Sequence, residues 1–410
     1  MNSNTDYQWH TLPSGLRVVY RYSPSNVTYC GFVVDAATRD EQQGKEGLAH
    51  YVEHMLFKGT HKRKAMSILN CMEHVGGEIN AFTSKEETVI YTVSLEPDFK
   101  RAVSLMADII QNSTMPEGES VKEKEVIVDE INSYLDNPAE LIFDEFENYL
   151  FNGHALGHNI LGDEASLSNI TPADGIAFMQ NFYTQTNMVF FFSGKTDFKR
   201  VIKTVQSATE GIRTNRVEFV RESPSQLIRF DKHEECNNYQ SHAIIGGGCC
   251  SLFDTNRFPL FLLNNIVGGP GMNSLLNVAL REKRGYVYNV EANVTNYTDT
   301  GLFTIYFGTD RKNVNRCFTI IRKELNKLKQ RELSSLRLND AKRQYIGQLT
   351  IGREIRENLA VASGKSLLRY NRCSTLAETI QKIESVTAKQ IIECANQIYD
   401  DANLSTLVLS

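Results

Sequence analysis

Two histidines and a glutamate lie close together in one short apolar stretch, residues 47–59, which reads Gly-Leu-Ala-His-Tyr-Val-Glu-His-Met-Leu-Phe-Lys-Gly. In a helix of about 3.6 residues per turn, His50 and His54 are one turn apart and project from the same face. Their ring nitrogens can therefore reach one ion, and neutral imidazole is a good zinc ligand. The alternative is a core helix whose two histidines are hydrogen-bonded. The spacing predicts a metal site that still needs a third ligand.

The acidic residue of this stretch is Glu53, three residues after His50. We expect it to lie next to the ion without binding it. A carboxylate in that place can take a proton from a metal-bound water, whose pKa zinc lowers towards neutrality, and pass it to a leaving amine. The order His-x-x-Glu-His is the inverse of the commoner zincin motif and is typical of inverzincins. This pattern predicts amide hydrolysis by metal-activated water.

A third ligand is expected from the helical run at residues 120–135, in which Glu123 and Glu130 are two turns apart and face the same way as Ile127. Charged side chains are seldom buried unless they are paired or bound to a metal. We therefore predict Glu130 as the ligand and Glu123 as a partner that orients a histidine or the ligand carboxylate. The alternative for each is a carboxylate that only faces water.

The elements around these residues alternate between strands and helices. Residues 8–22 alternate in polarity around a turn, and residues 27–35 are strongly β-prone, so the chain is expected to open with strands. Further strands are expected at 78–83 and 88–95, and helices at 67–75 and 99–111.

Length and composition limit the classes of protein. The 410 residues suggest two or three domains, and the net charge of −5 with scattered basic residues excludes the pattern of a nucleic-acid binder. No signal-like N-terminus or transmembrane-length apolar run is present, so we expect no membrane association and a cytoplasmic location. The eight cysteines show no Cys-x-x-Cys spacing and are expected to be buried thiols in a reducing compartment.

The second half of the chain repeats the first. When Tyr91 is set on Tyr306, residues 88–99 align with 303–314, and almost the same offset places Thr171 on Thr387. We therefore expect two homologous domains, residues 1–218 and 219–410. In the second copy Tyr345 stands near the position of Glu130, and the helix expected at 257–267 holds no histidine. The metal chemistry is thus expected only in the first domain.

The second copy has its own polar cluster at residues 281–288, after a glycine-rich turn at 268–271. The glycines could cradle a phosphate, but no Gly-Lys-Ser/Thr ending follows, so a plain turn is the better interpretation.

Taken together, the motif at residues 50–54 and Glu130 resemble the zinc site of the pitrilysin/insulinase family, in the short two-domain branch related to the mitochondrial processing peptidase. The likeness covers nearly the whole chain. It departs from the usual pattern at Tyr51-Val52, where Phe-Leu is more frequent, and at Tyr286, where an aliphatic residue is usual. Further matching stretches are residues 77–83, 123–132, 154–162, 183–194 and 281–288.

The resemblance implies a role for each matching residue. One Zn²⁺ per chain would be bound by three side chains, with one general base and one supporting carboxylate. An edge strand would receive the substrate backbone, and an arginine and a tyrosine of the second domain would bind the substrate carbonyl or its oxyanion. The zinc ligands would be His50, His54 and Glu130, with Glu53 as the base and Glu123 as the supporting carboxylate. The residues of the edge strand would be Asn80, Ala81 and Thr83. The arginine and tyrosine of the second domain would be Arg281 and Tyr288.

Two kinds of residue keep a plainer alternative. Arg281 and Tyr288 could be ordinary surface residues, because both types are common on surfaces. His154 and His158 could be further metal ligands, but the glycines that follow them favour structural roles in a loop.

The resemblance also implies an α+β fold in which each domain is a mostly antiparallel sheet packed with helices, half of a clamshell chamber. Two chains would then meet as a homodimer, with Arg281 and Tyr288 acting on the zinc site of the partner chain. The implied function is a zinc-dependent endopeptidase or oligopeptidase that hydrolyses short or unfolded peptides. A non-catalytic peptide-binding or scaffold subunit is the alternative, and an active subunit with a different, degenerate partner is a third possibility. The complete set of ligands and base favours the peptidase.

Overall fold

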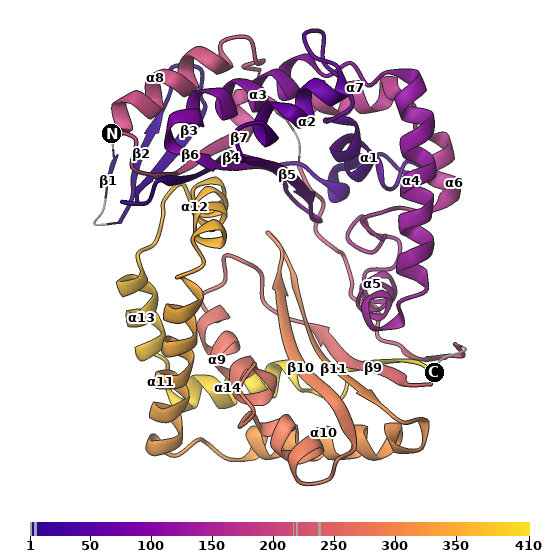
Figure 1. Ribbon diagram of the computed structural model, residues 1–410. Coiled ribbons are helices and arrows are strands. Elements are labelled where there is room, and N and C mark those ends of the chain that lie inside the picture. Colours follow the sequence, from indigo (N-terminus) through magenta and orange to yellow (C-terminus); the bar gives the residue numbers. More distant parts are fainter. Residues whose placement is uncertain (1, 4–5, 216, 219, 237–238) are drawn as a thin grey trace. The chain divides into compact units, whose positions relative to one another are not determined.

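The computed structural model describes residues 2–3, 6–215, 217–218, 220–236 and 239–410 (Figure 1). The chain forms two compact units, and each unit is assembled from three separate segments. The first unit consists of Met1–Asn132, Asn159–Arg221 and Gly352–Thr375, and the second of Ser133–His158, Glu222–Ile351 and Leu376–Ser410.

These compact units cut across the domain boundaries expected from the sequence. Residues 133–158 belong to the second unit, and residues 352–375 belong to the first. The expected division between 218 and 219 falls beside residue 219, which lies outside the described residues. That division stays a prediction about where one copy of the duplication ends, and the interleaving of segments is a separate finding.

The first unit is built on a mixed sheet with the strand order β1-β2-β3-β7-β4-β6-β5. Neighbouring strands are antiparallel except for β3 and β7, which run parallel. Strand β5 therefore lies at one edge of the sheet. The bounds are β1 Asn2–Ser3, β2 Gln8–Thr11, β3 Arg17–Tyr22, β4 Val27–Val34, β5 Glu78–Thr83, β6 Thr88–Leu95 and β7 Met188–Gly194.

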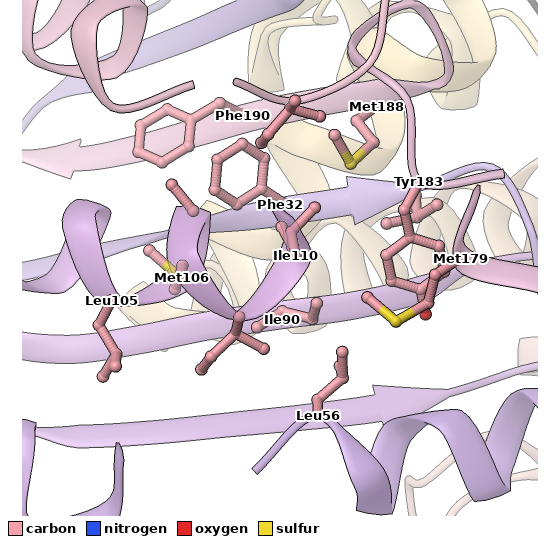
Figure 2. Packing of buried hydrophobic residues seen from close by; sticks show 14 of the residues in the cluster. Phe32, Leu56, Ile90, Leu105, Met106, Ile110, Met179, Tyr183, Met188 and Phe190 are labelled. Atoms are coloured by element: carbon pink, nitrogen blue, oxygen red, sulfur yellow. The ribbon is translucent and has the colours of Figure 1, made fainter. Parts of the chain in front are cut away.

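Helices cover both faces of this sheet, which is why its central strands are apolar on both sides. Alternate residues of β7 face opposite ways: Phe190 and Phe192 join the larger core, and Phe191 joins a smaller one. Figure 2 shows Phe190 in the larger core with Met106 and Ile110 of α3. The helices that contribute to it include α1 Leu48–Met55, α2 Ala65–Glu73, α3 Phe99–Asn112, α7 Pro172–Phe182 and α8 Phe198–Thr209.

The opposite face of the first sheet is covered by α12 (Arg356–Tyr370), which comes from the last quarter of the chain. Its Gly364 lies so close to the sheet that an added Cβ would be 2.8 Å from Val33 Cγ2 and 2.9 Å from Phe191 Cδ1. A glycine on the buried face thus lets this helix approach the strands closely.

The second unit repeats the topology of the first. Its strand order β10-β11-β9-β12-β8 has the same directions as β5-β6-β4-β7-β3, including one parallel pair at β12 and β8. Tyr91 on β6 and Tyr306 on β11 hold equivalent strands, as the sequence repeat predicted. The bounds are β8 Asp231–Glu234, β9 Ser241–Gly248, β10 Val287–Asn296, β11 Gly301–Thr309 and β12 Ser405–Leu409.

One helix from the first half of the chain completes the second unit. Helix α5 (Pro138–Leu150) places Ile142 and Phe146 against Ile244 and Leu407, on one face of the second sheet. The other face is packed mainly by α9 Arg257–Gly268, the π-helical turn η4 Asn277–Glu282, α10 Val314–Gln330, α11 Ser335–Gly352 and α14 Ala388–Ile398. Helix α5 therefore does for this sheet what α12 does for the first.

Three further helices belong to the described residues. They are α4 Glu117–Leu135, α6 Glu164–Asn169 and α13 Leu376–Glu384, with the short turns η1 Thr38–Asp40, η2 Glu96–Asp98, η3 Gln185–Asn187 and η5 Arg311–Asn313. Among the helices of the described residues, none combines the length and apolar character needed to span a lipid bilayer.

The α+β class expected from the sequence is confirmed, and most element bounds agree within a few residues. Helix α4 begins three residues before the predicted start, at Glu117. Acidic residues at Glu117 and Glu119 favour this earlier start, because negative charge stabilises the first turn of a helix. The eight cysteines form no disulfide among the described residues; four are buried, as expected, and four are only partly buried.

Candidate metal centre

Helix α1 carries the paired histidines and directly follows Gly47, whose φ of 92° lies in the left-handed region. An added Cβ at Gly47 would lie 2.5 Å from the carbonyl oxygen of Leu161, so glycine is favoured here by conformation and by space. Tyr51 and Met55 are fully buried in the core of the first unit. His50, Glu53 and His54 therefore share the helix with residues that fix its orientation.

The three predicted zinc ligands come together. Glu130 Oε2 of α4 lies 3.7 Å from His50 Nε2 and 3.5 Å from His54 Nε2. Each of the three residues has one potential ligand atom, and these three atoms lie within 4.8 Å of one another. Two ligands of a tetrahedral zinc, each at about 2.1 Å, are roughly 3.4 Å apart. The chemistry and spacing of this donor set therefore fit one zinc ion.

The two histidines differ in their surroundings. Burial, with a smaller effect of His54, lowers the pKa of His50 to about 3, so its imidazole is neutral, which is the form that binds a metal. Its Nδ1 has no hydrogen-bond partner among the described residues. In contrast, Nδ1 of His54 lies 3.1 Å from Glu123 Oε2. Only His54 thus has a carboxylate that directs its Nε2 towards Glu130.

Glu123 lies between His54 and a lysine. Its side chain is buried, and its other oxygen, Oε1, lies 2.5 Å from Lys58 Nζ. The ion pair offsets the cost of burying this carboxylate. Glu123 thus contacts one of the two histidines, and its role as a supporting carboxylate stays a prediction. The sequence analysis did not identify Lys58 as the partner of Glu123. Its position four residues after His54, about one helical turn further along the chain, is the signal that could have found it.

The predicted general base, Glu53, accepts a hydrogen bond of 2.6 Å from Thr83 Oγ1. Burial raises the pKa of Glu53, while the bond from Thr83 and the nearby His54 oppose that shift and Glu130 adds to it. A raised pKa brings the carboxylate closer to the value that suits a general base near neutral pH.

Thr83 belongs to the strand predicted to receive the substrate. Strand β5 is an edge strand that contacts α1, and Asn80 and Ala81 pair with Tyr91 and Ile90 on β6. Among the described residues, no strand pairs with the other side of β5, which an added peptide strand would need. The Thr83 hydroxyl donates its hydrogen bond to Glu53, and binding of the substrate backbone by Asn80, Ala81 and Thr83 stays a prediction.

Arg281 and Tyr288 lie in the second unit, whereas the histidine-glutamate cluster lies in the first. Arg281 is exposed within η4, and π-helical turns are frequent at functional sites. The Tyr288 hydroxyl donates a 3.1 Å hydrogen bond to Asp310 Oδ1, which raises the pKa of Tyr288. Their contact with substrate stays a prediction.

His154 and His158 are also outside the cluster of described metal-ligating side chains. The backbone N–H of Leu156 donates to His154 Nδ1 over 3.1 Å, and His154 Nε2 lies 2.9 Å from the carbonyl oxygen of Glu222. Both ring nitrogens of His154 thus hold loop backbone, which matches the structural role expected for it.

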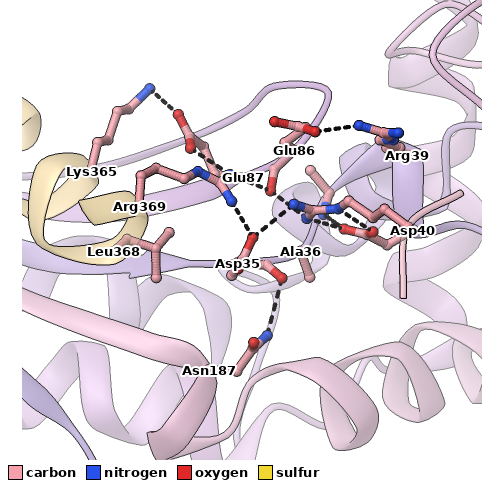
Figure 3. A network of polar contacts seen from close by, with 12 residues as sticks. Asp35, Ala36, Arg39, Asp40, Glu86, Glu87, Asn187, Lys365, Leu368 and Arg369 are labelled. Carbon is pink, nitrogen blue, oxygen red and sulfur yellow. Dashed lines mark hydrogen bonds and ion pairs between the residues drawn. The ribbon is translucent and has the colours of Figure 1, made fainter. Parts of the chain in front are cut away.

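A largely buried ion-pair network, which sequence reasoning missed, includes Glu86 and Glu87 (Figure 3). It fixes the turn at residues 84–87, which directly follows Thr83 and connects β5 to β6. The pairs are Arg39–Glu86 at 2.5 Å, Arg221–Asp40 at 2.7 Å, Arg369–Asp35 at 2.6 Å, Arg369–Glu87 at 2.8 Å and Lys365–Glu87 at 2.7 Å. Residues so far apart in sequence offer no local pattern that could have revealed it.

Comparison with known proteins shows the family to which the chain belongs. Residues 17–164 match the family model described as insulinase (peptidase family M16), and residues 169–345 match the one described as the peptidase M16 inactive domain. An uncharacterized zinc protease of Streptomyces coelicolor is 31% identical over 95% of this chain and 86% of its own length. The uncharacterized zinc protease YmxG of Bacillus subtilis is 29% identical over 96% and 95%. The chain belongs to the insulinase family of peptidases.

Solved structures show the same fold. A peptidase M16 inactive domain from Pseudomonas fluorescens superimposes with a TM-score of 0.91 at 19% identity, covering 98% of this chain and 97% of that one. A protease from Helicobacter pylori gives 0.90 at 21% identity, covering 99% of both chains. The similarity extends over both compact units.

Proposed function

We propose that this chain is a zinc-dependent endopeptidase or oligopeptidase of the inverzincin type that hydrolyses short or unfolded peptides. The observation that carries the proposal is the convergence of His50, His54 and Glu130, with Glu53 beside them on the same helix. The names of the relatives, which are zinc proteases, support a peptidase. A scaffold role has no need for a complete set of ligands and base.

The proposed roles follow from the contacts of each side chain. His50, His54 and Glu130 would hold one Zn²⁺, which when bound lowers the pKa of water and polarises the substrate carbonyl. Glu53, oriented by Thr83, accepts a proton from the attacking water and delivers it to the leaving amine. The backbone of β5 at Asn80 and Ala81 binds the peptide as an added strand.

The proposal extends to assembly and location. Arg281 and Tyr288 of one chain bind the substrate carbonyl or its oxyanion at the zinc site of a second copy, in a homodimer. The paired, exposed side chain of Tyr288 and the position of Arg281 in a π-helical turn support a role in binding. Eight cysteines without a disulfide among the described residues support a reducing compartment such as the cytoplasm.

The test compares the native chain with Glu53→Gln, and with Glu73→Gln as a control that removes an exposed carboxylate at the end of α2. Zinc content and hydrolysis of a quenched fluorescent peptide library are measured for each. We expect one zinc in all three proteins and a loss of kcat of about 10²–10⁴-fold in Glu53→Gln alone, because a general base contributes an effect of that size. Native activity in Glu53→Gln, or an inactive zinc-loaded native chain, would contradict the proposal.

A further inference from the structure

Helix α1 has only eight residues, so the unpaired amides of its first turn are a large share of its backbone groups. The residue before the helix is Gly47, which has no side chain to accept a hydrogen bond from them. Nevertheless, this helix must hold two imidazoles in one fixed direction. Some other part of the chain must therefore fix its N-terminus.

Glu41 supplies that cap from outside the helix. Its Oε2 accepts a 3.0 Å hydrogen bond from the backbone N–H of Gly47, and its Oε1 accepts one of 2.6 Å from the N–H of Ala49. The carbonyl oxygen of Lys45 accepts the N–H of Leu48 at 3.2 Å. One carboxylate thus binds the two amides on either side of Leu48, and its negative charge suits the positive end of the helix dipole.

The position of Glu41 is itself fixed by the ion-pair network. It directly follows η1, in which Arg39 pairs with Glu86, and Asp40 accepts hydrogen bonds of 2.8 and 2.7 Å from Arg221 (Figure 3). Asp40 also accepts a 2.9 Å hydrogen bond from the N–H of Ala37. The cap therefore comes from a segment that several hydrogen bonds and ion pairs hold in place.

Burial works against this arrangement. It raises the pKa of Glu41 well above its ordinary value, and the hydrogen bonds from Ala49 and Gly47 oppose that shift. A carboxylate is costly to bury, and an uncharged residue could fill the same space. The hydrogen bonds of the carboxylate to the first amides of α1 offset this cost. The shorter of the two is made with Ala49, the neighbour of His50.

We infer that Glu41 is a positioning residue of the metal centre, which fixes the first turn of α1 and thereby aims His50 at Glu130. The inference rests on the proposed zinc-dependent function and names a part of its site that no sequence motif indicated. Groups that orient ligands in this way typically change metal affinity by about 10–100-fold when they are removed.

The experiment uses the full chain and compares Glu41→Ala with Glu46→Ala. Glu46 is a matched control, because its carboxylate accepts a 3.0 Å hydrogen bond from the N–H of Gly44 in the same loop but does not bind α1. Zinc affinity is measured by competition with a chelator, and the visible spectrum of the Co²⁺-loaded protein reports the geometry of the ligands. We expect Glu41→Ala to weaken zinc binding about 10–100-fold and to alter the cobalt spectrum, with Glu46→Ala unchanged in both.

A second variant, Glu41→Gln, keeps the test decisive if Glu41→Ala does not fold. Its amide oxygen can accept one of the two hydrogen bonds, so we expect an intermediate loss of zinc affinity. Variants of Glu41 that lower thermal stability but keep native zinc affinity and a native cobalt spectrum would overturn the inference alone. A native chain that binds neither ion would overturn the proposed function together with it.

Discussion

The two candidate histidine ligands lie on one helix, and each is directed by a different kind of neighbour. His54 is held by the carboxylate of Glu123, and Glu123 in turn by Lys58. His50 instead depends on the backbone of its own helix, because its Nδ1 has no hydrogen-bond partner among the described residues. The direction of His50 should therefore be more sensitive than that of His54 to how α1 begins.

Kinetic measurements can distinguish two roles of Thr83, orienting Glu53 and binding substrate. Its hydroxyl bonds Glu53, so Thr83→Val should leave the base without its orienting partner. A hydrogen bond to a charged group contributes about 1.5–3 kcal/mol, so we expect kcat to fall roughly 10–100-fold with zinc content and KM near the native values.

The control for this substitution is Thr83→Ser, which keeps the hydroxyl and should keep most of kcat. Steady-state kinetics on one peptide substrate measure all three proteins. If Thr83→Val instead raises KM and leaves kcat unchanged, Thr83 binds substrate, as the sequence resemblance implied, and does not position the base.

At the scale of elements, the sequence predicted best what is local. The alternation of residues 8–22 and the single apolar stripe of residues 99–111 correspond to β2, β3 and α3, because one buried face per element leaves a clear period. That His50 and His54 share one helix face could be predicted for the same reason, since their spacing is one helical turn. Glu130 could be predicted as the third ligand because its carboxylate shares a helix face with the buried Ile127.

What the sequence could not predict depends on contacts between distant segments. The exchange of α5 and α12 between the units leaves no local signal, because an apolar helix face does not say which sheet it will cover. The cap from Glu41 was missed for a similar reason. A capping side chain normally stands at the residue before the helix, and here that residue is Gly47.

At the scale of the whole molecule, the two sheets share one topology, but only the first unit has the cluster of metal-ligating side chains among the described residues. The second unit, which lacks this cluster among the described residues, can therefore have a different function. In the proposed homodimer, that function is to provide Arg281 and Tyr288 to the partner chain.

Mixing two inactive variants tests this arrangement. A chain with Arg281→Ala keeps its zinc site, and a chain with Glu53→Gln keeps its arginine. If the sites are completed in trans, heterodimers formed after mixing contain one site with both groups, and roughly a quarter of the native activity returns when subunits exchange at random. Peptide hydrolysis before and after mixing measures the gain. Persistent inactivity in mixtures that demonstrably form heterodimers would show that Arg281 acts on its own chain.

The central claim is that His50, His54 and Glu130 hold one zinc ion, and the most direct measurement is the zinc content and affinity of Glu130→Gln beside Glu125→Gln. Glu125 is an exposed carboxylate on the same helix, so its substitution removes an equal charge without touching the cluster. The account predicts one zinc per chain for the native protein and for Glu125→Gln, and an affinity at least about 100-fold weaker for Glu130→Gln. Equal zinc affinity in all three proteins would contradict it.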